Sequence, residues 1–163
     1  MHNPIRVVFV CLGNICRSPL AEVIVRHQAN QQNIGHCFHF ESAGTGDWHI
    51  GRSADTRSAA TAQRHGLDLS QHKAQQITTN NIHQWDWFIA MDHENRLNLL
   101  AMGASSERII MMRQFERKSV ADDILNVPDP YYGGEHGFED VYVMLEENAN
   151  AIIEYISCAE RNL

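Results

Sequence analysis

Two residues that could together attack a phosphate group lie near the N-terminus, with five residues between them. Cys11 follows an apolar run at 7–10, and Arg17 closes the loop that begins at this cysteine. A loop of this length can curve so that its backbone N–H groups point inward at an anion, with a sulfur beneath the anion and a guanidinium beside it. The segment therefore predicts a site in which a thiolate attacks a phosphate ester.

The neighbouring residues decide how this loop is interpreted, because a lone cysteine after a buried strand is more often a core residue than a nucleophile. Gly13 allows tight curvature, and Asn14 tolerates the left-handed backbone conformation. The Ser-Pro pair at 18–19 is typical of a helix start, with Ser18 as the N-cap. The free N–H groups of that helix would face the loop and, with Arg17, favour the ionised form of the Cys11 sulfur.

The same donors would bind the oxygens of a phosphoryl group during its transfer. Arg17 suits two of these oxygens through its paired N–H groups, which a lysine could not match. Ser18 would hydrogen-bond the sulfur and make it a better leaving group. Cys16 has two open interpretations: an inert packing residue, or a thiol that captures an oxidised Cys11 as a reversible disulfide.

The elements that must position this loop alternate between strand-like and helix-like patterns. The expected strands are 6–10, 36–42, 87–91 and 108–112. The expected helices are 19–33, 53–65, 93–102 and 138–156, the last with a clear 3.6-residue apolar period. The alternation predicts an α/β fold, a doubly wound parallel sheet flanked by helices in a single domain over residues 1–163. Ligands of such folds bind at the carboxyl ends of strands, where Cys11 lies.

Composition and charge exclude several classes of function. A net charge of −7 over 163 residues disfavours nucleic acid and anionic membranes as partners. No run approaches the roughly 18 apolar residues of a membrane span, and the first residues lack the features of a signal peptide. Four scattered cysteines do not make a disulfide framework. We therefore expect a cytoplasmic protein.

Neither a metal nor another cofactor is expected. His36 and His39 flank Cys37, but no second cluster with ligand spacing completes a zinc site. The Gly-Thr-Gly at 44–46 lacks the third glycine of a dinucleotide fingerprint, and no Walker loop is present.

Several motifs, taken in order, resemble those of the low-molecular-weight protein tyrosine phosphatases. The loop Val-Cys-Leu-Gly-Asn-Ile-Cys-Arg-Ser-Pro at 10–19 and the distant Asp-Pro-Tyr-Tyr at 129–132 are the most specific. Shorter matches are Ser-Ala-Gly-Thr at 42–45, Asp-Trp at 47–48, Gly-Arg at 51–52, His-Lys-Ala at 72–74 and Ala-Met-Asp at 90–92. The resemblance covers nearly the whole chain and implies a four-stranded parallel sheet with the phosphate-binding loop after strand 1.

The resemblance also implies roles for individual residues. Cys11 would be the nucleophile, Arg17 the phosphate clamp and Asp129 the general acid and base. The phosphate-binding loop would comprise Leu12, Gly13, Asn14, Ile15, Cys16 and Ser18. Asn14, Ser18, Ser42 and His72 would form the hydrogen-bond network that holds this loop. Trp48, Tyr131 and Tyr132 would wall the cleft, with Leu12 and Ile15 at its mouth.

A carboxylic acid at position 129 also suits this chemistry independently of the resemblance. Proton donation to a leaving phenolate is worth about 10²–10⁴-fold in rate, and the same carboxylate can then activate water against a phosphocysteine. Asp-Pro alone is more often a turn, and only the adjoining tyrosines and the Cys11 loop favour the catalytic interpretation. The expected activity is metal-independent hydrolysis of phosphotyrosine and small aryl phosphates. The substrate would be a tyrosine-phosphorylated protein, with tyrosine kinases as natural candidates, and the enzyme a monomer or weak dimer.

Three alternative functions compete with this activity. An arsenate reductase would need further cysteines, and Cys37 and Cys158 do not lie in the stretch where a shuttle pair is expected. A protein-arginine phosphatase would be expected to carry Thr at position 15, whereas Ile15 and the two tyrosines favour a flat phenyl ring. A non-catalytic phosphate-binding module would not need both Cys11 and Asp129.

Overall fold

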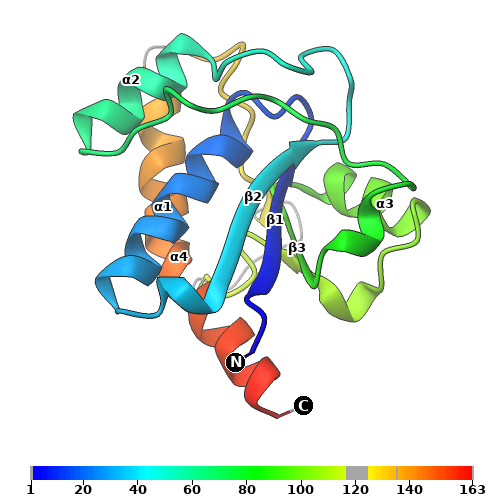
Figure 1. The fold of residues 1–163 in the computed structure, drawn as a ribbon. Coiled ribbons are helices and arrows are strands. Elements are labelled where there is room, and N and C mark those ends of the chain that lie inside the picture. Colours follow the sequence, from blue (N-terminus) through cyan, green and yellow to red (C-terminus); the bar gives the residue numbers. More distant parts are fainter. Residues whose placement is uncertain (1, 117–124, 135, 163) are drawn as a thin grey trace.

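The computed structural model describes residues 2–116, 125–134 and 136–162, in which a parallel sheet lies between helices (Figure 1). The strands are β1 (Ile5–Cys11), β2 (Phe38–Gly44), β3 (Trp87–Ala90) and β4 (Ile109–Met111). All pairings are parallel and the order is β2-β1-β3-β4. The predicted four-stranded parallel sheet is confirmed, and β1, which ends at Cys11, lies inside it.

Among the described residues, four α-helices cover the two faces of the sheet. They are α1 (Arg17–Gln31), α2 (Thr56–Arg64), α3 (His93–Ala101) and α4 (Gly137–Arg161). Short 3₁₀ turns are η1 (Gly35–Cys37), η2 (Ile82–Gln84) and η3 (Ser106–Arg108). Figure 1 shows α1, α2 and α4 on one side of the sheet and α3 on the other. Within the described ranges, no helix combines the length and apolarity needed to span a bilayer.

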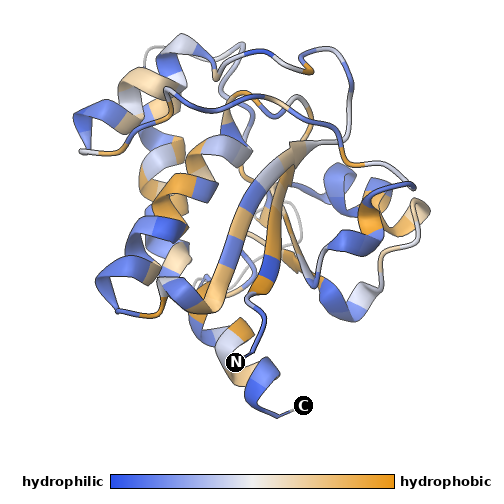
Figure 2. Ribbon diagram, in the orientation of Figure 1, coloured by the Kyte–Doolittle hydropathy of each residue, from blue (hydrophilic) through white to orange (hydrophobic). Residues whose placement is uncertain are grey.

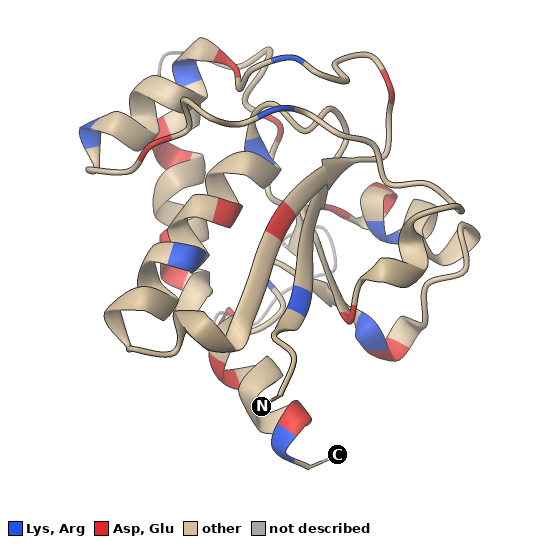
Figure 3. Ribbon diagram, in the orientation of Figure 1, with Lys and Arg blue, Asp and Glu red and all other residues tan. Residues whose placement is uncertain are grey.

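Strand β1 is buried on both faces, which fixes its end firmly in space. Val7 and Phe9 pack in one apolar cluster with α1 and α4, and Val8 and Val10 pack in a second cluster with Leu99 of α3. Burial on both faces explains why this strand is a continuous apolar run rather than an alternating one. Figure 2 shows this apolar character along β1, and Figure 3 shows the charged residues mainly on helices and connections.

Strand β2 lies two residues later in the chain than the predicted range 36–42. Gly35–Cys37 form a 3₁₀ turn, and β2 continues to Gly44, which pairs with Cys11. A Cβ atom at Gly44 would lie 2.7 Å from the Leu12 carbonyl oxygen, closer than real Cβ atoms approach. Only glycine therefore lets the loop after β1 pass so close to β2.

Both ends of α1 differ from the prediction. The helix begins at Arg17, so its N-cap is Cys16, which makes no capping hydrogen bond with the described residues. The prediction of Ser18 as N-cap is wrong, because the loop after Cys11 already turns into the helix two residues earlier. At the other end the helix stops at Gln31 rather than at the predicted residue 33, and Asn33 with φ 61° takes the left-handed conformation just beyond it.

Candidate active site

The Cys11 sulfur lies at the carboxyl end of β1 and lines a cavity of about 400 Å³. The residue is only 2 % exposed. Its sulfur lies 3.0 Å from the Ser18 hydroxyl oxygen, and the backbone N–H of Asn14 donates to it at 3.3 Å. Ser18 therefore takes the sulfur-binding position that the sequence indicated, although it does not cap the helix. The Asn14 N–H and the Ser18 hydroxyl therefore both face the sulfur.

Asn14 holds the loop in its curved shape from a fully buried position. Its φ of 57° places it in the left-handed region. Its side chain donates to the Ser18 hydroxyl at 2.8 Å and accepts from the backbone N–H of Gln75 at 2.9 Å. His72 Nε2 donates to the Asn14 carbonyl oxygen at 2.7 Å. The structure thus brings Asn14, Ser18 and His72 together around the loop.

Ser42 does not join this network through its hydroxyl group. The hydroxyl oxygen is buried and has no hydrogen-bond partner among the described residues. The parallel pairing of Ser42 with Phe9 fixes its backbone, whose carbonyl accepts from Gln75 Nε2 at 2.9 Å. The expected role of the Ser42 side chain is corrected accordingly. Gln75, which was not identified from the sequence, links Ser42 to Asn14 instead.

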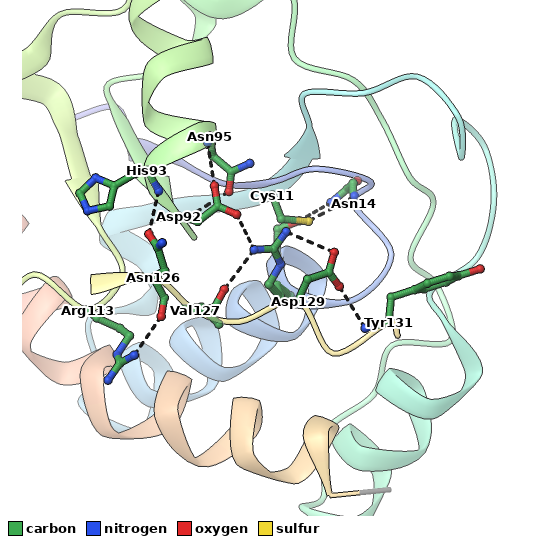
Figure 4. A network of polar contacts seen from close by, with 12 residues as sticks. Cys11, Asn14, Asp92, His93, Asn95, Arg113, Asn126, Val127, Asp129 and Tyr131 are labelled. Atoms are coloured by element: carbon green, nitrogen blue, oxygen red, sulfur yellow. Dashed lines mark hydrogen bonds and ion pairs between the residues drawn. The ribbon is translucent and has the colours of Figure 1, made fainter. Parts of the chain in front are cut away.

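Arg17 is almost fully buried, at 3 % exposure, yet it remains charged. Its Nη1 donates to Asp92 Oδ2 at 2.7 Å and to the Val127 carbonyl oxygen at 3.1 Å (Figure 4). Burial disfavours the charged guanidinium, but the negative charge of Cys11 and the hydrogen bond to Asp92 outweigh it and raise the pKa of Arg17. A cation already oriented beside the sulfur is suited to bind phosphate oxygens.

Asp92 was not identified as a site residue from the sequence, although it lies in one of the matched motifs. It follows β3, and β3 pairs with β1, so the carboxyl ends of these strands lie together. Its carboxylate also accepts from the backbone N–H of Asn95 at 2.8 Å, which caps α3. This second attachment fixes the carboxylate that orients Arg17. An acidic residue directly after a buried parallel strand was the signal that could have revealed it.

Asp129 lines the same cavity from a distant segment of the chain. Its Oδ2 lies 3.6 Å from Arg17 Nη2, and its Oδ1 accepts from the backbone N–H of Tyr131 at 3.0 Å (Figure 4). The segment is attached to the sheet because the Val127 N–H donates to the Met91 carbonyl oxygen at 2.7 Å. The side chain is 40 % exposed, so it can exchange protons with water and substrate.

The remaining predicted site residues form the walls of the cavity. The lining includes Leu12, Gly13, Ile15 and Cys16 from the loop, Trp48 and His49 from the connection after β2, and Tyr131 and Tyr132 beside Asp129. His49 is an addition to the predicted set. The rings of Tyr131 and Tyr132 meet edge to face, with centroids 4.8 Å apart.

Cys16 packs with Ala74 and Phe138 and is buried. Burial is the main cause that raises the pKa of its thiol, and the nearby Asp55 carboxylate adds to this effect. A protonated, packed thiol fits the first of its two interpretations, and reversible pairing with Cys11 stays a prediction. No group of three or more His, Cys, Asp or Glu side chains in 2–116, 125–134 and 136–162 is arranged to hold a metal ion.

This arrangement of a sulfur, a buried guanidinium and a carboxylate around one cavity is typical of cysteine-dependent phosphatases. The chain belongs to the family of low molecular weight phosphotyrosine protein phosphatases, whose family model matches residues 6–161.

Individual relatives extend over nearly the whole chain. Low molecular weight protein-tyrosine phosphatase A of Mycobacterium tuberculosis is 36% identical over 156 residues, covering 96% of this chain and 94% of the relative. The low molecular weight protein-tyrosine-phosphatase of Streptomyces coelicolor is 40% identical over 152 residues, covering 91% of each.

Solved structures show the same fold. The protein tyrosine phosphatase from Entamoeba histolytica superposes with a TM-score of 0.85 at 32% identity, covering 98% of this chain and 99% of that one. A Drosophila arginine phosphatase superposes with a TM-score of 0.81 at 28% identity, covering 92% and 96%.

Proposed function

We propose that this protein is a cytoplasmic protein tyrosine phosphatase that hydrolyses phosphotyrosine and small aryl phosphates through a phosphocysteine intermediate. One observation carries the proposal: Cys11, Arg17 and Asp129 line a single cavity, with the guanidinium 3.6 Å from the carboxylate. Cys11 is the nucleophile, Arg17 binds the phosphate, and Asp129 moves the protons. The family and the names of the relatives support the same activity.

In the first step, the Cys11 thiolate attacks phosphorus, so that an S–P bond forms while the bond from phosphorus to the phenolic oxygen breaks. Arg17 and the N–H groups of the loop bind the three other phosphate oxygens, whose charge they stabilise. Asp129 begins this step protonated and donates its proton to the departing phenolate. The products are phosphocysteine, free tyrosine in the substrate and an ionised Asp129.

In the second step, the Asp129 carboxylate takes a proton from a water molecule that attacks phosphorus. The new O–P bond forms as the S–P bond breaks, and inorganic phosphate leaves with the sulfur again a thiolate. The Ser18 hydroxyl, 3.0 Å from the sulfur, stabilises the thiolate as it departs. Asp129 ends the cycle protonated, ready for the next substrate.

The walls of the cavity favour an aromatic phosphate ester. Trp48 and Tyr131 line it together with the side chain of Ile15, which is itself largely buried. A phenyl ring can pack against these apolar and aromatic groups while its phosphate reaches the sulfur. The partner would therefore be a protein with an accessible phosphotyrosine.

Phosphoarginine is the second candidate substrate, because an arginine phosphatase from Drosophila shares the fold. Its flexible, cationic guanidinium offers less surface to the aromatic walls than a phenyl ring does. We therefore expect the purified protein to hydrolyse a phosphotyrosyl peptide faster than a phosphoarginyl peptide of the same sequence. Faster release of phosphate from the phosphoarginyl peptide would reverse this assignment.

The test of the mechanism is Cys11→Ser, compared with Cys37→Ser at an exposed cysteine outside the cavity. We expect Cys11→Ser to abolish release of phosphate from a phosphotyrosyl peptide, since a hydroxyl at this position is a far weaker nucleophile. Binding of inorganic phosphate, measured by calorimetry, should persist in this variant. Cys37→Ser should behave as the parent protein. Full activity in Cys11→Ser would exclude the proposed mechanism.

A further inference from the structure

The N-terminal turn of α2 contacts the back of the phosphate-binding loop. The backbone N–H of Asp55 donates to the Ile15 carbonyl oxygen at 2.8 Å. The hydroxyl of Ser58, which is fully buried, donates to the Cys16 carbonyl oxygen at 3.0 Å. These two bonds fix the start of α2 relative to the loop that carries the Cys11 sulfur.

Arg57 extends from this same turn to the segment that carries Asp129. Its Nε and Nη2 donate to the two carboxylate oxygens of Asp55, at 3.1 and 3.0 Å, in a paired arrangement. The remaining nitrogen, Nη1, donates to the Tyr131 carbonyl oxygen at 3.1 Å. The guanidinium carbon also lies 5.3 Å from the ring centroid of Tyr131 and 4.7 Å from that of Phe138. Both the backbone and the ring of Tyr131 are therefore held from α2.

Tyr131 connects Arg57 to the carboxylate of Asp129. The Tyr131 N–H donates to Asp129 Oδ1 at 3.0 Å, while its carbonyl accepts from Arg57. Figure 4 shows Asp129 beside Tyr131, and the other carboxylate oxygen of Asp129 lies 3.6 Å from Arg17 Nη2. The contacts thus run from Asp55 through Arg57 and Tyr131 to the carboxylate.

We propose that Arg57 is a positioning residue for the general acid. By joining the segment 129–131 to the helix that also holds the phosphate-binding loop, it sets the distance between Asp129 and Cys11. Arg57 is not among the described residues that line the cavity, so it acts through Asp129 rather than on the substrate. This inference rests on the proposed function, in which Asp129 protonates the leaving group.

Two substrates with different leaving groups distinguish a misplaced general acid from a general structural effect. Phenyl phosphate needs a proton at the departing oxygen, whereas 2,4-dinitrophenyl phosphate leaves as a stable anion. We expect Arg57→Ala to lower kcat/KM for phenyl phosphate by about 10–100-fold, since a misplaced acid loses much of its effect. The loss for 2,4-dinitrophenyl phosphate should stay within about threefold. Arg57→Lys, which cannot hold Asp55 and the Tyr131 carbonyl together, should lie between the parent and Arg57→Ala.

Arg64→Ala is the matched control, because Arg64 lies on the same helix and its ion pair is with Glu139 of α4. It should leave kcat/KM for both substrates unchanged. In Asp129→Ala, adding Arg57→Ala should reduce kcat/KM for phenyl phosphate by less than about threefold, because the group that Arg57 positions is already gone.

Three results would overturn the inference: no loss in Arg57→Ala, an equal loss for both substrates, or a full additional loss in the double variant. These comparisons require that the parent protein hydrolyses both esters and that its Cys11→Ser variant hydrolyses neither. If the parent hydrolyses neither ester, the proposed function itself fails.

Discussion

The phosphate-binding loop and the segment 129–132 face the same cavity, yet they are held in opposite ways. In the loop, Asn14 is fully buried and Arg17 is 3 % exposed, and their polar groups are bonded within the core. In the other segment, the Asp129 side chain is 40 % exposed and Tyr132 is 91 % exposed. The position of the nucleophile is thus part of the folded core, whereas the position of the acid depends on a few contacts at the surface.

This difference matches what the two groups must do. The sulfur must hold one geometry toward phosphorus, which close packing enforces. The carboxylate must meet both the leaving oxygen and water, which requires access to solvent. Substitutions in the first region should therefore change stability and activity together, whereas those in the second should change activity with little effect on stability.

The largest expected effect separates activity from stability at Asp129. We predict that Asp129→Ala lowers kcat/KM for phenyl phosphate by about 10²–10⁴-fold, because the leaving group loses its proton donor. The free energy of unfolding, from urea titration, should change by no more than about 0.5 kcal/mol, since the side chain is partly exposed. A large loss of stability would contradict the contrast between the two regions.

The second prediction concerns Asn14, whose substitution should lower both stability and activity. Asn14→Ala leaves the Gln75 N–H and the Ser18 hydroxyl without their partner and forces alanine into a left-handed conformation. We expect the free energy of unfolding to fall by about 2–4 kcal/mol. Turnover of phenyl and 2,4-dinitrophenyl phosphate should fall alike, because the loop itself is altered.

Asn33→Ala is the control for backbone conformation, since Asn33 also has a positive φ but is exposed and lies outside the cavity. It should lower the free energy of unfolding by only about 1 kcal/mol and leave turnover unchanged. Equal losses in Asn14→Ala and Asn33→Ala would show that the buried hydrogen bonds around Asn14 contribute little.

The smallest expected effect is a pH dependence of stability that arises from the Asp55 carboxylate. Asp55 contacts the phosphate-binding loop through its backbone and Arg57 through its side chain. Burial disfavours its ionised form, but the hydrogen bonds from Arg57 outweigh this and hold the pKa of Asp55 below the ordinary value of 3.8. A lowered pKa means that the carboxylate stabilises the folded protein above pH 3.8, and that this contribution disappears as the pH falls through the lower value.

Asp55→Asn, which keeps a capping side chain, should therefore lower the free energy of unfolding by about 1 kcal/mol near neutral pH. Below pH 3.8 the difference from the parent protein should shrink toward zero. Thermal unfolding of both proteins from neutral pH to below pH 3.8 measures this difference in stability. A difference that grows on acidification would contradict the assignment.

Most of the fold was predictable because its elements depend on local patterns. The apolar run at 7–10 predicted a strand, and the structure has one there that is buried on both faces. Element ends were less predictable, because they depend on tertiary contacts. Gly35–Cys37 form a turn rather than the start of β2, and the phosphate-binding loop starts α1 one residue before Ser18.

The site was predictable where its residues lie close together in sequence. The segment from Cys11 to Arg17 has its own spacing, and the expected neighbours of the sulfur lie where they were predicted. Arg57 and Asp92 were missed because they act across 74 and 75 residues of sequence, and such contacts leave no periodic pattern. The Ser42 hydroxyl was expected to help hold the loop, but it has no hydrogen-bond partner among the described residues. The backbone N–H of Gln75 donates to the Asn14 side chain instead, which is again a contact between residues far apart in sequence.

The most direct test is to trap the phosphorylated sulfur. Asp129→Ala should still react with 2,4-dinitrophenyl phosphate, which needs no proton donor, but should hydrolyse the intermediate slowly because it lacks the base. Acid quenching followed by peptide mass spectrometry should find one phosphoryl group on Cys11, and none after Cys11→Ser is added. A phosphoryl group on another residue, or none at any reaction time, would contradict the account.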